Sequence, residues 1–139
     1  IHGVKDVEKP VDLNIAIRGN PFRSGDVVPR GFLTVLSPGE PVHFTKGSGR
    51  LELADIIVKQ PIAIRVIVNR IWKGHMGTGI VDTPSNFGKN GERPVHPELL
   101  DFLAQKFVEH KYSIKAMHRE IMLSQAYQLS SEVTPVPKS

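Results

Sequence analysis

The hydrophobic period of this chain changes once, at the glycine-rich segment 47–50, and this change limits what each half can form. Before that segment, apolar residues alternate with polar ones over 11–18, which is the period of a half-buried β-strand. Five of the 11 prolines lie in the first 45 residues, where they interrupt extended segments. After the segment, apolar residues recur with the period of an α-helix. The sequence therefore predicts an α+β fold that is mainly α.

The first half is predicted to be rich in loops, with short β-strands. One strand covers 11–18 and ends at Gly19-Asn20-Pro21, a sequence typical of turns. A second short strand is expected over 32–36, and a third extended piece over 42–45.

The second half is predicted to form a small bundle of three to four helices. A short helix is expected over 51–58. The next segment is rich in β-branched residues, which favour strands. Its apolar residues nevertheless share one helical face, so we predict a helix from about 61 to 74.

Two amphipathic helices are predicted after a long connection, residues 74–96, which we expect to be functional or packed on itself. The first opens at Pro97, and Ser113 is predicted to cap the second. The residues expected to face the core are Leu99, Leu100, Leu103 and Phe107 in the first helix and Ile114, Met117 and Ile121 in the second, with His118 turned toward them.

We divide the chain into three parts. Residues 1–46 form an extended, β and loop segment, 47–130 a helical domain, and 131–139 a flexible tail. The first residues, Ile1-His2-Gly3, contain no Met, so we expect the chain to be a fragment of a longer polypeptide.

Composition excludes several classes of function. The 139 residues contain no Cys, so the chain has no disulfide, zinc ribbon, thiolate nucleophile or covalent haem attachment. No apolar run approaches the ~20 residues of a membrane span. The net charge of +4 is spread along the chain rather than clustered, which argues against direct nucleic-acid binding. A weaker alternative is a helix-turn-helix made by the last two helices.

Two polar segments each allow a structural and a functional interpretation. Gly47-Ser48-Gly49-Arg50 precedes a helix and could bind an anion, but we favour a tight turn in which Arg50 pairs with a carboxylate or with helix carbonyls. Asn69 and Arg70 lie in an apolar helix, with Arg70 projecting among apolar neighbours. We favour a buried hydrogen-bond network that ties the glycine-rich loop to the helices over a ligand site.

The histidines of the helical half do not show the spacing of a metal site, and we assign no metal to the chain. The alternatives are a site made by His96 and Glu98 with His75, and a His75-Met76 ligand for a neighbouring haem. Otherwise His96 caps a helix and His118 is a packed residue. Ser85 and Ser124 lack an identifiable base, so nucleophilic catalysis has no support. The candidate functional or structural network comprises Arg50, Asn69, Arg70, His75, Arg93, His96, His118 and Arg119.

Several motifs form a series that matches a known family. They are Gly47-Ser48-Gly49-Arg50-Leu51-Glu52-Leu53-Ala54, Val68-Asn69-Arg70-Ile71-Trp72, His75-Met76-Gly77-Thr78-Gly79, Thr83-Pro84-Ser85-Asn86-Phe87-Gly88 and Gly91-Glu92-Arg93-Pro94-Val95-His96-Pro97. The series resembles the C-terminal planctomycete-specific domain of unknown function that accompanies cytochrome c domains in secreted or periplasmic bacterial proteins. The resemblance implies a helical domain beside haem-bearing domains, and it implies no particular reaction.

Two hypotheses follow. In the first, the chain is an accessory or interaction domain of an exported, periplasmic or secreted, cytochrome c-linked multidomain protein. Its partners are the other domains or subunits, and haem is bound by those neighbours rather than by this chain. In the alternative, the chain contributes an active site for hydrolytic or redox work on an extracellular polymer. That site would be built around Arg70, His75, Arg93, His96 and His118.

Overall fold

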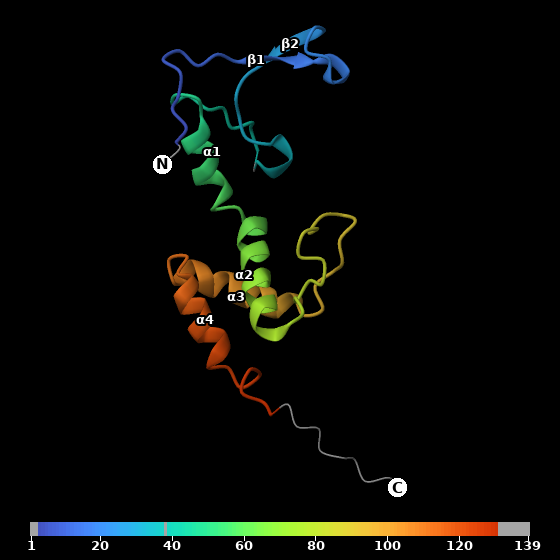
Figure 1. Ribbon diagram of the computed structural model, residues 1–139, viewed down its shortest axis with the longest axis vertical. Helices are drawn as coiled ribbons and strands as arrows, with labels where there is room; N and C mark the ends of the chain where they lie inside the picture. Colours follow the sequence, from blue (N-terminus) through green and yellow to red (C-terminus); the bar gives the residue numbers. More distant parts are fainter. Residues whose placement is uncertain (1–2, 38, 131–139) are drawn as a thin grey trace. The chain divides into compact units, whose positions relative to one another are not determined.

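The computed structural model describes residues 3–37 and 39–130, and the chain divides after Gln60 into two compact units. The predicted tail, 131–139, lies outside the described residues. The predicted fold class, α+β and mainly α, is confirmed (Figure 1). In chain order the elements are β1 (Leu13–Ala16), a 3₁₀ turn (Ile17–Gly19), β2 (Ser24–Val28), a 3₁₀ turn (Thr34–Leu36), α1 (Arg50–Ile57), α2 (Pro61–Met76), α3 (Pro97–Glu109) and α4 (Ile114–Met122).

The first unit contains a two-stranded antiparallel sheet. Leu13 of β1 lies opposite Val28 of β2, and the register shifts between Asn14 and Ala16. The predicted strand 11–18 is therefore shorter than expected. It stops at a 3₁₀ turn because Arg18 and Gly19 both adopt positive φ, 54° and 76°, a conformation that no strand accommodates.

We predicted that the alternating residues of this strand would bury one of its faces, and this prediction is wrong. All four residues of β1 are exposed, and Leu13 keeps 74% of its surface accessible. A two-stranded sheet supplies no second layer to cover it. The partner strand β2 was not predicted, because its sequence Ser-Gly-Asp-Val-Val lacks the alternation on which strand predictions rest.

The predicted strand 32–36 is wrong, since Thr34–Leu36 form a 3₁₀ turn. The chain is extended only just before it, where Gly31 bridges His43 of the predicted third piece. Two backbone hydrogen bonds, from Phe32 N–H to the Val42 carbonyl and from Phe44 N–H to the Arg30 carbonyl, hold this bridge at 2.8 Å each. Phe32 is the one buried hydrophobic residue among the described residues of this unit.

Polar contacts connect the loops of the first unit. The Arg30 guanidinium donates to the Asp12 carboxylate at 2.7 Å and to the Gly47 carbonyl at 2.6 Å. The hydrogen bonds from Arg30 lower the pKa of Asp12 below its usual value. The Glu52 carboxylate of α1 accepts from the backbone N–H groups of Thr45 and Lys46. These contacts join segments that share little apolar surface.

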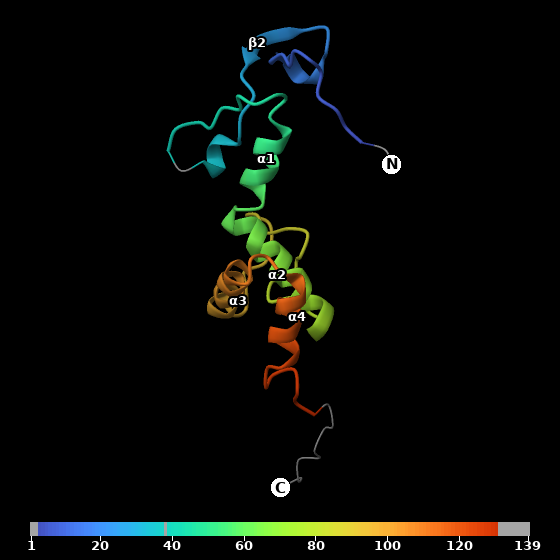
Figure 2. The same ribbon diagram turned by 90° about the vertical axis from the view of Figure 1, so that its left-hand side faces the viewer.

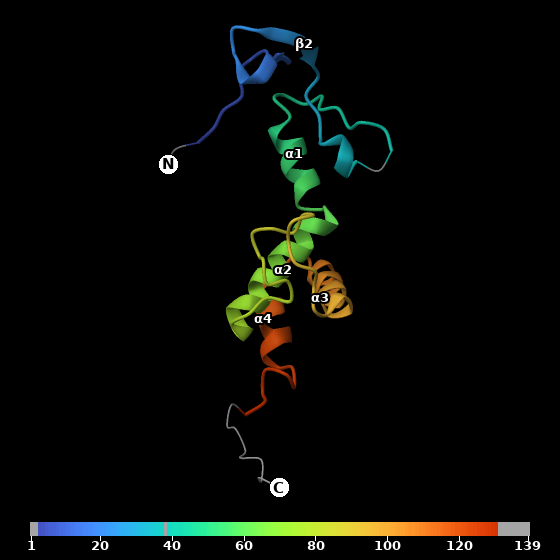
Figure 3. The same ribbon diagram turned by 90° about the vertical axis from the view of Figure 1, so that its right-hand side faces the viewer.

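The second unit is built on α2, α3 and α4, which pack against one another in pairs. Figures 2 and 3 show the three helices from opposite sides. The prediction of a helix over 61–74 is confirmed with an end two residues later, at Met76. Helical periodicity thus outweighs the β-branched composition of this segment, because only a helix gathers its apolar residues on one face. Among the described residues, no helix combines the length and apolar character needed to cross a bilayer.

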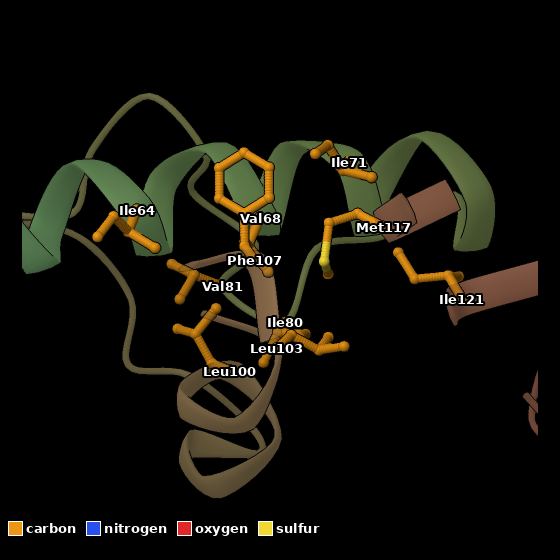
Figure 4. Close-up of a cluster of buried hydrophobic side chains, with 10 residues drawn as sticks. All are labelled: Ile64, Val68, Ile71, Ile80, Val81, Leu100, Leu103, Phe107, Met117 and Ile121. Atoms are coloured by element: carbon orange, nitrogen blue, oxygen red, sulfur yellow. The ribbon is translucent and has the colours of Figure 1, made fainter. Parts of the chain in front are cut away.

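The core of the second unit draws on all three helices and on the connection between α2 and α3. Its buried side chains point toward a common centre (Figure 4). They are Ile64, Val68, Ile71, Ile80, Val81, Leu100, Leu103, Phe107, Met117 and Ile121. The predicted core face of α3 is confirmed by Leu100, Leu103 and Phe107, with Leu99 partly buried against them.

Helix α4 confirms its predicted cap. The Ser113 hydroxyl accepts a hydrogen bond from the Ala116 N–H at 3.3 Å, and Met117 and Ile121 are buried. Two expectations fail. Ile114 is 49% exposed, whereas the Tyr112 ring stands edge-on to the buried Phe107. His118 is also exposed rather than packed on the apolar face.

The connection between α2 and α3 packs on itself and on the core. This is one of the two alternatives that we predicted for residues 74–96, the other being a functional loop. Ile80 and Val81 are both 2% exposed. The Val95 N–H donates to the Ile80 carbonyl at 2.9 Å and closes the loop near its two ends. Inside it, Gly91 approaches Asn86 so closely that a Cβ atom on Gly91 would lie 1.9 Å from the Asn86 carbonyl oxygen. The segment is therefore a folded part of the unit.

Candidate functional site

The buried amide of Asn69 ties the α2–α3 connection to helix α2. Its Oδ1 accepts from the Val81 N–H at 2.8 Å, and its Nδ2 donates to the Val81 carbonyl at 2.9 Å. The side chain is fully buried, and this pair of bonds satisfies both backbone groups of Val81. Gly79 leaves room for this arrangement, since a Cβ there would lie 2.3 Å from the Val81 carbonyl oxygen. The predicted buried network is confirmed for Asn69.

Arg70 does not belong to that network. Its side chain is exposed and makes no hydrogen bond or ion pair with any described residue. The prediction of a buried role for Arg70 is wrong, although it lies on the same helical face as the half-buried Ala63, Val66 and Ile67. One residue further along a helix turns the side chain by about 100°, away from the buried stripe. Keeping the guanidinium in water also avoids the cost of burying a charge without a partner.

Two histidines meet where the end of α2 faces α4. Nε2 of His75 lies 2.7 Å from Nδ1 of His118, and the ring centroids are 4.9 Å apart with an interplanar angle of 73°. The ring of Tyr127 stands at 90° to that of His75, with centroids 5.7 Å apart. We call His75 and His118 the histidine pair. His75 is half-buried and His118 is exposed.

Local packing explains why these three rings converge. His118 follows the fully buried Met117, so anchoring Met117 in the core fixes the direction of its neighbour. After α4 the Ser124 hydroxyl donates to the Ile121 carbonyl at 2.6 Å and accepts from the Tyr127 N–H at 3.3 Å. This turn returns the chain and places Tyr127 on His75. Sequence analysis did not single out Tyr127.

Chemically, the histidine pair can share one proton between two ring nitrogens. One imidazole donates and the other accepts, and the tautomers decide which does which. Neither ring forms an ion pair with a carboxylate among the described residues. The pair therefore lacks the orienting acid of a catalytic triad in this part of the chain.

Two other predicted site residues of the second unit, Arg93 and His96, form no hydrogen bond or ion pair with the histidine pair. Arg93 and His96 are exposed, and their side chains make no hydrogen bond or ion pair with described residues. His96 occupies the N-cap position of α3, but its side chain does not cap the helix. Within residues 3–37 and 39–130, no three His, Cys, Asp or Glu side chains gather as a metal site would require, so His75, His96 and Glu98 do not converge.

Arg50 takes the structural role that we favoured, in the first unit. Its guanidinium pairs with the Asp6 carboxylate at the start of α1. Asp6 also accepts from the Ser48 N–H at 2.8 Å and from the Ser48 hydroxyl at 2.6 Å. These bonds, with those from Ser48 contributing most, lower the pKa of Asp6 below its usual value. A carboxylate of the chain itself thus occupies the position that an external anion would take.

Comparison with known families decides where this chain belongs. A family model described as PSD1, protein of unknown function (DUF1553), matches residues 49–139. The chain is a member of the DUF1553 family. No curated protein and no solved structure matches it. The DUF1553 match begins one residue before α1 and takes in Asn69, the histidine pair and Tyr127, whereas Asp6 precedes it.

An apolar groove lies within the DUF1553 region, along α3 and the end of α4. It encloses about 450 Å³. Phe102 and Leu123 line it while keeping 50% and 64% of their surfaces exposed. Arg119, one of the predicted site residues, lies in the same groove beside Glu120. The remaining lining residues are Trp72, Leu99, Leu103, Ile121, Ser124 and Ala126.

Proposed function

We propose that this DUF1553 chain is an accessory domain that binds other domains or subunits of an exported, cytochrome c-linked protein. The apolar groove of the second unit carries the proposal. In this view the chain supplies no self-contained reaction, and the haem is bound by its partners.

The composition of the groove suits a protein partner. Phe102, Leu123 and Trp72 offer apolar and aromatic contact area, which is what the centre of a protein interface provides. Arg119 and Glu120 give charges of both signs at the same surface, and such charges favour correct orientation of a partner. A groove of this kind accepts one or two side chains of a neighbouring domain as anchors.

The polar residues that the sequence singled out give indirect support. Asn69 is occupied by the backbone of Val81, and Arg50 by Asp6. Arg70, Arg93 and His96 are exposed without a described polar partner. Asn69 and Arg50 therefore stabilise the fold, whereas the three exposed residues are accessible to another domain.

The exported, haem-associated setting rests on the resemblance of the motifs. The series from Gly47-Ser48-Gly49-Arg50 through His75-Met76-Gly77 to His96-Pro97 is similar to the planctomycete-specific domain that accompanies cytochrome c domains. The DUF1553 match supports the family, and the cytochrome partner, the planctomycete origin and the periplasmic or secreted location are proposals.

The proposal is tested by binding this chain to the purified holo cytochrome c domain encoded with it, using calorimetry. Phe102→Ser and Leu123→Ser should each weaken binding by about tenfold or more, as expected for anchors at an interface centre. Val108→Ser is the matched control, because Val108 is a 42% exposed residue of α3 that does not line the groove. Absence of binding at micromolar concentrations, or equal weakening by all three variants, contradicts the proposal.

The histidine pair favours a second candidate function, the contribution of an active site. Only His75 and His118 of the five residues proposed for that site are in contact with each other. Turnover of an extracellular polymer by the purified chain, lost in His75→Gln but retained in Phe102→Ser, would support this candidate over the accessory role.

A further inference from the structure

We propose that the histidine pair is an acid-sensitive clasp, which holds the turn after α4 against the end of α2 and opens when both rings are protonated. We call residues 124–127 the groove turn, because Ser124 and Ala126 line the apolar groove. The inference concerns the shape of this groove and does not depend on what binds there. It rests on the hydrogen bond between the rings, on the charges around them, and on the position of Tyr127.

The hydrogen bond between the two rings tolerates one added proton but not two. In the neutral pair, one of the facing nitrogens of His75 and His118, 2.7 Å apart, carries a proton and the other accepts it. A first added proton can bind the outer nitrogen of the donating ring, which makes no hydrogen bond among the described residues. The bond then becomes charge-assisted. A second proton must bind the accepting nitrogen, so that two cations direct N–H groups at each other and the rings separate.

The charges on the two helices favour the first proton and oppose the second. His75 lies in the last turn of α2, where unpaired carbonyl groups stabilise a cation. Lys115 lies three residues before His118, on the same face of α4, and repels further positive charge. Lys73 is two residues before His75 and therefore on another side of α2, and Arg119 lines the groove.

No carboxylate offsets a second positive charge on the pair. Among the described residues, none forms an ion pair with either ring, and Asp82, Glu92 and Glu98 of the connection and of α3 form no ion pair at all. The Tyr127 phenol is in contact with His75, and a phenol adds no charge in acid. The ionised side chains of α3 and α4 that do pair have other partners. These ion pairs are Arg65–Asp101, Lys106–Glu109 and His110–Glu120.

Opening of the clasp releases the groove turn. The Tyr127 ring packs edge-on with the His75 ring, with centroids 5.7 Å apart, and this contact joins the turn to α2. Separation of the two histidines reorients His75 and removes the contact. Met117 and Ile121 stay buried in the core, so α4 itself remains in place. Acid therefore moves one wall of the groove while the three helices stay packed.

Proton binding sets the direction of the switch. The closed pair binds at most one added proton, whereas two separated rings bind two. A free histidine side chain takes up its proton near pH 6.5, about one unit below neutral or less. Below that pH, each further unit of decrease favours the open form by about tenfold, because the open form holds one proton more. The clasp is therefore closed at neutral pH and opens in mild acid.

The proposal is tested on the whole chain by nuclear magnetic resonance of the labelled imidazole nitrogens, from about pH 8 to about pH 4.5. In the parent, His75 and His118 should bind two protons in separate steps, and the contact between Tyr127 and His75 should be lost with the second. In His118→Asn an amide oxygen replaces Nδ1 and accepts from protonated His75, so the Tyr127 contact should persist in acid. His96→Gln is the matched control and should behave as the parent, since its side chain has no described polar partner.

Trp72 gives a second readout, because it is the one tryptophan of the chain and lines the groove. Its emission should shift to longer wavelength with the second protonation step in the parent, and should not shift in His118→Asn. The proposal is overturned if the two rings bind their protons independently of each other, or if Tyr127 stays on His75 after both are protonated. An equal shift of Trp72 emission in the parent and in His118→Asn also overturns it. Phe102→Ser should leave both protonation steps unchanged, so failure of the groove as a binding site is distinguishable from failure of the clasp.

Discussion

At the scale of single residues, Asn69 does more for this fold than any other polar side chain of α2. It meets the N–H and the carbonyl of Val81, and all of these groups are buried. Replacing Asn69 by Leu, of similar size, leaves both backbone groups without a partner. Each such group costs about 1–3 kcal/mol, so we expect the free energy of unfolding to fall by about 2–6 kcal/mol in urea denaturation.

The adjacent residue provides the control. Arg70→Gln alters an exposed side chain that has no described polar partner, and it should change the free energy of unfolding by less than about 0.5 kcal/mol. Equal destabilisation by the two substitutions would show that Arg70 is part of the buried network after all.

At the scale of elements, the start of α4 depends on one side chain. The Ser113 hydroxyl accepts from the Ala116 N–H, which would otherwise lack a partner in the first turn. The bond is long, at 3.3 Å, so Ser113→Ala should cost about 0.5–1 kcal/mol, the lower part of the usual range for caps. Thermal unfolding followed by circular dichroism measures this loss.

Ser85→Ala is the matched control for the cap, because Ser85 is an exposed loop serine outside every helix. It should leave the melting temperature unchanged. If Ser113→Ala also leaves it unchanged, the cap does not stabilise α4, and docking of Met117 and Ile121 alone must hold the helix in place.

At the scale of the whole molecule, stability is concentrated in the second unit. All ten residues of the core cluster come from residues 64–121. We therefore expect residues 61–130, produced alone, to unfold cooperatively with a urea midpoint close to that of the same unit in the full chain. Residues 3–60 should show no comparable transition, since Phe32 is their one buried hydrophobic residue. A fragment 61–130 without cooperative unfolding would refute this assignment of stability.

The helices were the part of the fold that could be predicted from sequence. Pro61, Pro97 and Ser113 carry local information about where helices begin, and hydrophobic periodicity gave the buried faces. The strands were predicted less well. The conformation of residues 32–36 and the pairing of β2 depend on hydrogen bonds to other segments. The local alternation of apolar and polar residues does not encode those bonds.

The candidate site was predicted in part. Asn69 was recognisable because an amide in an apolar helix needs a partner. The active-site alternative placed His75 and His118 in one site with three further residues, but their direct pairing was not predicted. They are 43 positions apart, so no spacing rule relates them.

The sequence by itself determined the class of fold, the starts of α2, α3 and α4, and most of the residues these helices bury, because periodicity and caps act over a few positions. Only the tertiary structure decided which polar side chains meet. The packing of α2 on α4 brings His75 to His118, and the turn at Ser124 brings Tyr127 to His75. Such contacts depend on how helices pack against each other, and that packing is set by the shape of the whole core.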